Sequence, residues 1–265
     1  MSVKLATTLS PRPWGVDRLP APFLSPPGER IGEVWFTPPA ALDALLVKYL
    51  FTSEALSVQV HPSDAQAPAG SRGKEECWYV TAALPGARLA IGFIRRLSED
   101  ELRAAARDGS IEHLLDWHDV RPGDFFYIPA GTVHAIGAGV SLIEVQQNSD
   151  ITYRLYDYGR PRELHLDEGM KVAQGAPYPA ALHRHVLASG SETLVEGPYF
   201  RLDRLDGAPN ADTAGRYCGR VLVLPLDTPL AVNGEPVMPG DCALAESIAA
   251  IEFGSGLSLI TQPIG

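Results

Sequence analysis

Three short segments carry polar side chains at strand-like spacing, and they constrain this chain more than any other feature. They are Gln59-Val60-His61-Pro62, Lys74-Glu75-Glu76-Cys77-Trp78 and Pro129-Ala130-Gly131-Thr132-Val133-His134. Alternate side chains of an extended strand share a face, so Gln59 and His61 point one way while Val58 and Val60 point the other. One face of this strand is therefore apolar, and the other carries groups that can bind a metal.

The same segments offer ligands for one divalent metal ion. Glu76 begins an aromatic, β-branched strand, and burial of its carboxylate is costly unless the group is paired or bound to a metal. His134 follows a turn built on Pro and Gly and enters the next strand. Two neutral imidazoles, His61 and His134, together with Glu76 form the ligand set of a catalytic zinc or a similar ion. Gln59 is a weaker fourth donor.

The spacing of these ligands resembles the two-motif pattern of the cupin superfamily. The flanking residues are similar to signature segments of type I phosphomannose isomerase in its short bacterial form. Four segments carry this resemblance in order, at 56–62, 73–79, 129–137 and 152–158. The resemblance implies a mainly β fold with two cupin-like β-barrel or jelly-roll domains. It also implies one Zn2+ per chain and the interconversion of mannose 6-phosphate and fructose 6-phosphate.

The resemblance assigns roles to further residues. Arg154 matches the catalytic arginine of the family, where it steadies an oxyanion or helps to move a proton. Three residues match positions that bind the substrate or its phosphate: Ser57, Lys48 and Lys74. Glu144 lies on a predicted strand at 141–146 and can face the interior, so it is a candidate for the catalytic base. The alternative for Glu144 is a carboxylate that orients a ligand or pairs with a cation.

The rest of the chain predicts turns and short strands with one helical interruption. Ser98 and Glu101 have the spacing of a capping box and Gly109 is a plausible stop, so we expect a helical insert at about 98–116, covering one end of the barrel. We expect a metal-binding catalytic domain at 1–175, a linker at 176–190, and a smaller C-terminal β domain without metal ligands at 191–265.

Charge and composition limit the possible partners. The formal net charge of -10 argues against nucleic acid, although local cations could still hold a small phosphorylated sugar. The sequence shows no transmembrane run or signal peptide, which predicts a cytoplasmic protein without a membrane partner. Three widely spaced cysteines, Cys77, Cys218 and Cys242, suit reduced thiols. The sequence leaves the oligomeric state open.

Other functions compete with the phosphosugar isomerase. A cupin-type metal oxygenase would use similar ligands with iron, but it has no reason to gather Lys48, Lys74 and Arg154. A non-enzymatic sugar-binding module would tolerate the loss of metal ligands, whereas this chain keeps them all. An isomerase of a related or unphosphorylated sugar remains open.

Overall fold

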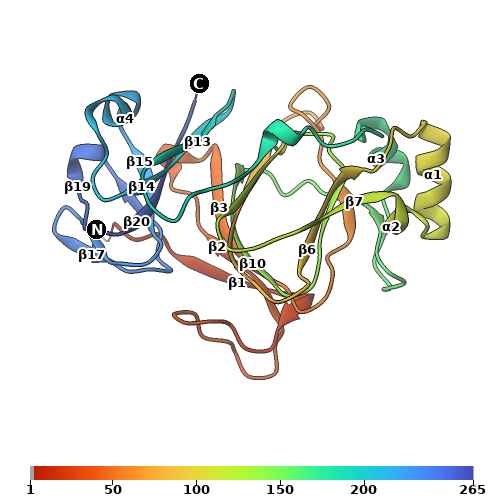
Figure 1. The fold of residues 1–265 in the computed structure, drawn as a ribbon, viewed down its shortest axis with the longest axis horizontal. Coiled ribbons are helices and arrows are strands. Elements are labelled where there is room, and N and C mark those ends of the chain that lie inside the picture. Colours follow the sequence, from red (N-terminus) through yellow and green to blue (C-terminus); the bar gives the residue numbers. More distant parts are fainter. Residues whose placement is uncertain (1–2, 265) are drawn as a thin grey trace.

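The computed structural model describes residues 3–264, which form stacked antiparallel sheets with helices at one end (Figure 1). The central layer is a seven-stranded sheet in the spatial order β1-β2-β3-β10-β5-β8-β12. Its strands are β1 (Thr7–Val16), β2 (Ile31–Phe36), β3 (Leu45–Phe51), β10 (Val140–Gln147), β5 (Glu76–Ala83), β8 (Asp124–Ile128) and β12 (His183–His185). The second signature segment, 73–79, therefore supplies the start of β5 to this layer.

A five-stranded sheet packs against one face of the central sheet. Its strands, in spatial order, are β11 (Tyr153–Tyr156), β4 (Val58–Val60), β9 (His134–Ile136), β6 (Arg88–Phe93) and β7 (Leu115–Asp119). Trp78 and Phe126 of the central sheet share a buried cluster with Leu89 and Ile91 of the five-stranded sheet. The two sheets thus form a face-to-face jelly-roll sandwich, and the predicted mainly β, cupin-like fold is confirmed.

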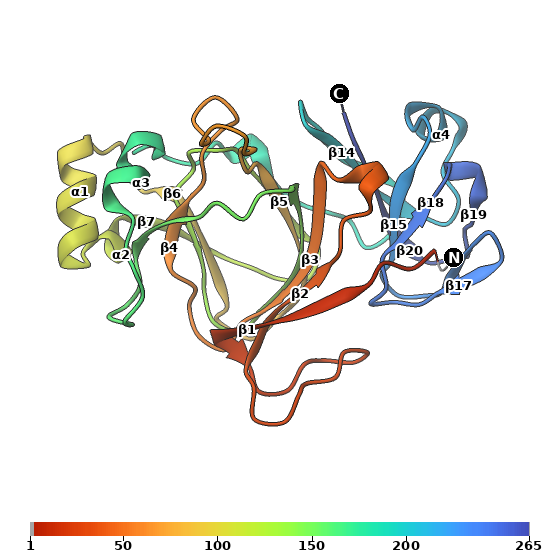
Figure 2. The same cartoon turned by 180° about the vertical axis from the view of Figure 1, so that it is seen from behind.

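Helices cover the outer face of the five-stranded sheet, as both views show (Figures 1 and 2). They are α1 (Glu99–Asp108), α2 (Ile111–Leu114) and α3 (Leu166–Val172). Leu102 and Ala105 of α1 share a cluster with Val58, Val60 and Ala135 of the sheet. The helical insert is confirmed, but it covers a sheet face rather than the end of a barrel. The sequence did not predict α3.

The first turn of α1 has the predicted capping box. The Ser98 hydroxyl accepts a hydrogen bond from the Glu101 N–H at 3.3 Å, and the Glu101 carboxylate accepts one from the Ser98 N–H at 2.8 Å. We expect Ser98→Ala to lower the free energy of unfolding by about 1 kcal/mol, measured by chemical denaturation. The matched control is Ser71→Ala at an exposed loop position, which should change stability by less than about 0.5 kcal/mol. Equal stabilities for the two variants would contradict the capping role.

The C-terminal part of the chain packs on the other face of the central sheet. Its larger sheet contains β13 (Glu192–Glu196), β14 (Phe200–Asp206), β20 (Leu257–Pro263), β15 (Val221–Pro225) and β18 (Ala243–Ala245), and its smaller sheet contains β17 (Glu235–Val237), β16 (Leu230–Val232) and β19 (Ile251–Glu252). The short helices of the molecule are α4 (Ala211–Arg216), η1 (Ala40–Leu42), η2 (Ala180–Leu182) and η3 (Ile248–Ala250). Tyr49 and Val145 share a buried cluster with Leu202 and Leu259. The central sheet is therefore covered on both faces.

The stretch 176–190, expected as a linker, also contributes to the central sheet. It contains β12, which pairs with β8 so that His183 lies opposite Phe126. Tyr178 and Val186 of this stretch are buried. None of the helices in residues 3–264 has the length and apolar character needed to cross a bilayer.

Candidate active site

Three buried side chains from the two facing sheets form a candidate metal site. His61 follows β4, His134 begins β9 and Glu76 begins β5. One ligand atom from each residue lies within 4.8 Å of the others. The distance from Glu76 Oε2 to His61 Nε2 is 3.5 Å, and that from Glu76 Oε1 to His134 Nε2 is 3.4 Å. The three ligands predicted from the sequence therefore lie together.

Backbone contacts fix the histidine tautomers. His61 Nδ1 lies 2.8 Å from the carbonyl oxygen of Ile151, and His134 Nδ1 lies 2.9 Å from that of Thr132. A carbonyl oxygen only accepts hydrogen bonds, so each Nδ1 carries the hydrogen and each Nε2 presents its lone pair to Glu76. Burial lowers the pKa of both rings, that of His134 to about 4, so both imidazoles are neutral near pH 7.

The unpaired atoms of this cluster fit a bound cation. Glu76 Oε1 and His134 Nε2 are both buried and have no hydrogen-bond partner in the described chain. Two acceptors facing each other in a buried place are costly, and a cation between them removes that cost. Burial raises the pKa of Glu76 to about 7 although the Lys74 ammonium lies 2.8 Å away, so a cation here would also favour the ionised carboxylate. Two imidazole nitrogens and a carboxylate suit zinc.

Two tight turns bring the ligand segments together. The Gly131 N–H donates to the carbonyl of His61 at 2.8 Å, which ties the turn before β9 to the end of β4. Gly131 has a φ of +83°, and a Cβ there would lie 2.8 Å from the carbonyl oxygen of Val172, so a side chain does not fit. The Lys74 N–H donates to the Pro62 carbonyl at 2.9 Å and holds the start of the second segment against the first.

A cavity of about 480 Å³ lies beside the metal ligands. The remaining residues nominated from the sequence all line it: Ser57, Gln59, Lys48, Lys74, Glu144 and Arg154. Lys74 joins the cavity to the candidate metal site, because its Nζ lies 3.1 Å from His61 Nε2. The structure therefore places every nominated side chain in one continuous site.

Side chains of alternating charge, all buried except the half-exposed Arg12, run from this cavity to the metal ligands. The contacts of this charge chain are Arg12–Glu33 at 2.6 Å, Glu33–Lys48 at 4.0 Å, Lys48–Glu144 at 2.9 Å, Glu144–Lys74 at 3.8 Å and Lys74–Glu76 at 2.8 Å. Strand register places Glu144 opposite Lys48 on one side and Trp78 on the other. Burial alone would raise the pKa of Glu144, but Lys48 and Lys74 hold it at about 2.

Arg154 approaches the site from the edge of the five-stranded sheet. It lies opposite Gln59 on β4, which in turn lies opposite His134 on β9. Its Nη1 donates to the carbonyl oxygen of Glu163 at 2.7 Å, whereas its Nε is buried without a hydrogen-bond partner. Burial and the nearby guanidinium of Arg162 lower the pKa of Arg154. Arg154 therefore lines the cavity with a guanidinium whose Nε has no hydrogen-bond partner among the described residues.

The cavity contains charged residues that the sequence analysis did not nominate, among them Arg12, Glu33 and Arg162. The sequence does contain a signal for Glu33, because a carboxylate in the apolar strand β2 needs a partner when it is buried, just as Glu76 does. Arg12 and Arg162 gave no such signal, because arginines next to prolines are ordinary in exposed turns.

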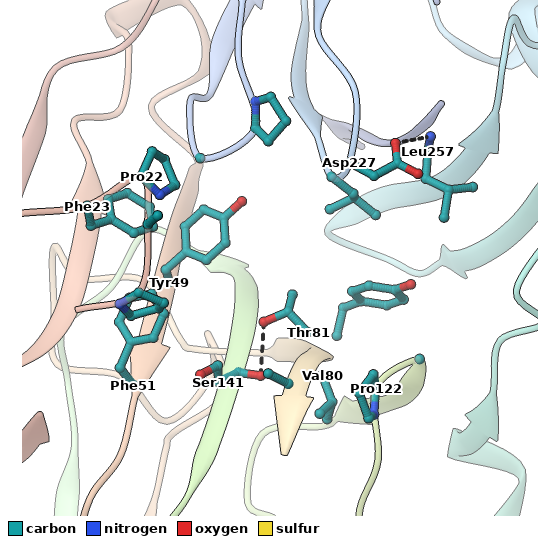
Figure 3. A pocket seen from close by; sticks show the side chains of 18 residues that line it. Pro22, Phe23, Tyr49, Phe51, Val80, Thr81, Pro122, Ser141, Asp227 and Leu257 are labelled. Carbon is teal, nitrogen blue, oxygen red and sulfur yellow. Dashed lines mark hydrogen bonds between the residues drawn. The ribbon is translucent and has the colours of Figure 1, made fainter. Parts of the chain in front are cut away.

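A second cavity, of about 390 Å³, lies between the central sheet and the C-terminal part (Figure 3). Its walls include Tyr49 and Phe51 from the outer face of the central sheet. Two of its polar groups already bond to backbone: the Thr81 hydroxyl donates to the Ser141 carbonyl, and the Asp227 carboxylate accepts from the Leu257 N–H. None of the site residues predicted from the sequence lines this cavity.

The fold and the site together define a cupin-like protein with a candidate metal centre beside a cationic cavity. No protein-family model matches the chain. The chain is 43% identical over 166 residues to a mannose-6-phosphate isomerase of Streptococcus mutans, which covers 59% of this chain and 52% of that relative. It spans about half the length of the curated relatives it matches.

Solved structures of the same name share the whole fold. The mannose 6-phosphate isomerase of Bacillus subtilis superposes with a TM-score of 0.80 at 26% identity, covering 98% of this chain and 99% of that one. A zinc-bound mannose 6-phosphate isomerase superposes with a TM-score of 0.72 at 14% identity over 98% of each chain, which shows a shared fold. The resemblance to type I phosphomannose isomerase is thereby confirmed.

Proposed function

We propose that the chain is a metal-dependent aldose-ketose isomerase that interconverts mannose 6-phosphate and fructose 6-phosphate. The observation that carries this proposal is the buried cluster of His61, Glu76 and His134 beside a cavity lined by Arg154 and two lysines. The names of the relatives and of the solved neighbours support the same reaction. An oxygenase would need the metal ligands but would not need these cations.

We propose one Zn2+ as the metal, held by His61, Glu76 and His134 with Gln59 as a fourth donor. Bound there, zinc would polarise the sugar oxygens at the carbons between which the hydrogen moves. The chain prepares the site by fixing both histidine tautomers through backbone carbonyls and by keeping both rings neutral. The zinc-bound neighbour of the same fold supports this choice of metal.

The reaction moves a hydrogen between C1 and C2 of the sugar through an enediol, so negative charge develops on a sugar oxygen. Arg154 has the unused Nε–H donor, and we propose that it stabilises this charge. The Ser57 hydroxyl and the ammonium groups of Lys48 and Lys74 line the same cavity and would hold sugar hydroxyls. These donors orient the substrate before the hydrogen moves.

Glu144 suits an orienting role better than that of the base. Its Oε1 accepts a hydrogen bond from Lys48 Nζ at 2.9 Å and its Oε2 accepts one from Trp78 Nε1 at 3.1 Å. Both oxygens are thus engaged, and a pKa of about 2 makes the carboxylate a weak base. We therefore propose that Glu144 holds Lys48 and Lys74 in place.

Glu144→Gln separates the two roles. Loss of a general base should cost about 10² to 10⁴-fold in kcat, whereas loss of an orienting carboxylate should cost about tenfold. We expect the smaller loss of kcat. Exchange of the C2 hydrogen of the substrate with deuterated solvent reports the step in which that hydrogen moves. A double-mutant cycle with Lys48→Met should show a coupling of at least about 0.5 kcal/mol in stability, because the single variant leaves a buried ammonium unpaired. A kcat loss beyond about 10²-fold without coupling would restore the base role.

One assay tests the proposed function itself. Purified protein is given a panel of hexoses and hexose phosphates, and the metal content of the same sample is measured. We expect isomerisation of mannose 6-phosphate, with zinc near one ion per chain. Equal rates on free and phosphorylated mannose would favour an isomerase of free sugars. Oxygen consumption in the iron-loaded protein, without isomerisation, would favour the oxygenase.

The remaining expectations concern location and organisation. We infer a cytoplasmic location from the cysteines, because Cys77, Cys218 and Cys242 are all free thiols, as suits a reducing compartment.

We also propose that the chain divides into a catalytic unit at 1–175, a connection at 176–190 and a C-terminal unit at 191–265. Limited proteolysis that cuts first within 186–192 would support this division.

A further inference from the structure

The lysines of the cavity are poorly placed to receive the phosphate dianion that the proposed substrate carries. The side chains of Lys48 and Lys74 are only 5% and 6% exposed. Lys48 Nζ lies 2.9 Å from Glu144, and Lys74 Nζ lies 2.8 Å from Glu76. A dianion that drew Lys74 away would take the close cation from the buried Glu76, and one that drew Lys48 away would break its ion pair with the buried Glu144, which is costly. The phosphate therefore needs other cations.

Two arginines that line the same cavity are much more accessible. The side chain of Arg12 is 35% exposed and that of Arg162 is 25% exposed. They come from distant parts of the chain, Arg12 from β1 and Arg162 from the loop after β11, and both line the cavity together with Arg154. A hydrated phosphate group can reach these guanidiniums without displacing the buried Lys48 or Lys74.

Both arginines share their carboxylate partners with a second cation. Glu33 lies 2.6 Å from Arg12 and 4.0 Å from Lys48. Asp157 lies 2.6 Å from Arg162 and 2.9 Å from Arg160. Five basic side chains line the cavity against three acidic ones, Glu33, Glu144 and Asp150, so its lining is cationic although the chain as a whole carries -10.

We propose that Arg12 and Arg162 form the phosphate seat of this enzyme, with Arg154 between that seat and the metal ligands. The inference rests on the proposed function and assigns residues to the phosphate of its substrate. Planar guanidinium groups match the oxygen geometry of a phosphate and can bind it with two parallel hydrogen bonds. Seated there, the phosphate would leave Lys48 and Lys74 to the sugar hydroxyls.

The electrostatics of Arg154 support this arrangement. After burial, the guanidinium of Arg162 is the largest influence that lowers the pKa of Arg154, and Arg12 acts in the same direction. Arg162 and Arg12 are thus each close enough to disfavour the charge of Arg154, which Asp157 offsets in part. Like charges gathered around one cavity cost free energy until an anion neutralises them, which favours binding of a dianion.

The test compares Arg12→Met, Arg162→Met and Arg162→Lys with wild type. For each variant the KM and kcat for mannose 6-phosphate are measured, together with the Kd of inorganic phosphate by calorimetry. We expect each Met variant to raise KM and this Kd by about tenfold while kcat changes less than threefold, because a binding contact has been removed. Arg162→Lys should recover only part of the affinity, since lysine keeps the charge but not the planar fork.

Arg95→Met is the matched control, because Arg95 is exposed, pairs with Glu101 on the helical insert and does not line the cavity. It removes the same charge and should leave KM and the phosphate Kd unchanged. Circular dichroism checks that Arg162→Met folds, since Asp157 still has Arg160 as a partner.

The outcomes distinguish binding of the phosphate by the arginines from binding by the lysines, and failure of the phosphate seat from failure of the proposed function. If the Met variants keep the wild-type KM and phosphate Kd while Lys48→Met or Lys74→Met raises both, the lysines hold the phosphate and the proposed seat is wrong. If wild type isomerises no hexose phosphate, the proposed function fails, but the calorimetry still tests the seat with inorganic phosphate alone. A phosphate Kd that rises equally in Arg95→Met would show only a general charge effect and would overturn the seat.

Discussion

His134→Ala is expected to abolish metal binding and to lower kcat by about 10³-fold or more, the largest effect of any single change in this protein. A bound metal supplies several kcal/mol of charge stabilisation, and each 1.36 kcal/mol is a factor of ten in rate. His134 is fully buried and its Nε2 has no hydrogen-bond partner within residues 3–264, so the variant removes a ligand for which we expect no replacement. His61→Ala should behave in the same way.

The metal content is measured by elemental analysis, so the result does not depend on activity. The matched control is His113→Ala, because His113 is exposed on α2 and outside the cavity. That variant should keep both the metal and the rate. Circular dichroism and the melting temperature show whether His134→Ala remains folded, which the separate apolar clusters of both sheets favour. Full metal content with normal turnover in both His61→Ala and His134→Ala would remove the metal site from the mechanism.

Arg154→Ala is expected to lower kcat by about 10²-fold or more without loss of metal. This is the scale for removal of one donor to a developing oxyanion, which is the role proposed for the Nε of Arg154, an atom without a partner among the described residues. Because Arg154 is not a metal ligand, elemental analysis should give the wild-type zinc content. Arg154→Lys should recover only part of the rate, since lysine lacks the planar fork.

The balance between kcat and KM decides what Arg154 does. A transition-state donor affects kcat, whereas a group that binds substrate and transition state equally affects KM alone. If Arg154→Ala raises only KM, Arg154 belongs to the phosphate seat with Arg12 and Arg162. Arg95→Ala, in the loop before α1, serves as the exposed arginine control and should leave both constants unchanged.

The sequence predicted the candidate metal ligands well because their signal is local. A strand places alternate side chains on opposite faces, so Gln59 and His61 had to face away from Val58 and Val60 wherever the strand packed. In the structure the two valines are buried under the helices, and Gln59 lines the cavity. The same alternation put Glu144 on the inner face of its strand.

The helices show where such local signals end. The capping box of Ser98 predicted where α1 begins, but nothing in its sequence said which surface it would cover. The segment Leu166–Val172 has acidic residues in its first turn and a lysine in its last, but it lacks a side-chain cap and contains a glycine, so its helical signal is weak. Its Gly169 packs against Leu155, where a Cβ would lie 2.4 Å from a side-chain atom. Packing on the sheet, rather than propensity, explains this helix.

By itself the sequence determined which side chains face the interior and which of them can bind a metal, because strand periodicity and the chemistry of His and Glu are properties of short segments. Only the tertiary structure decided which basic side chains form buried ion pairs and which remain accessible at the cavity. Lys48 and Glu144 are 96 positions apart and meet because β3 and β10 are neighbours. Arg12 lies on β1 and Arg162 follows β11, and these are edge strands of the two facing sheets. The two arginines therefore line one cavity only because the sheets pack together. Ion pairing depends on distance in space, and strand order sets that distance.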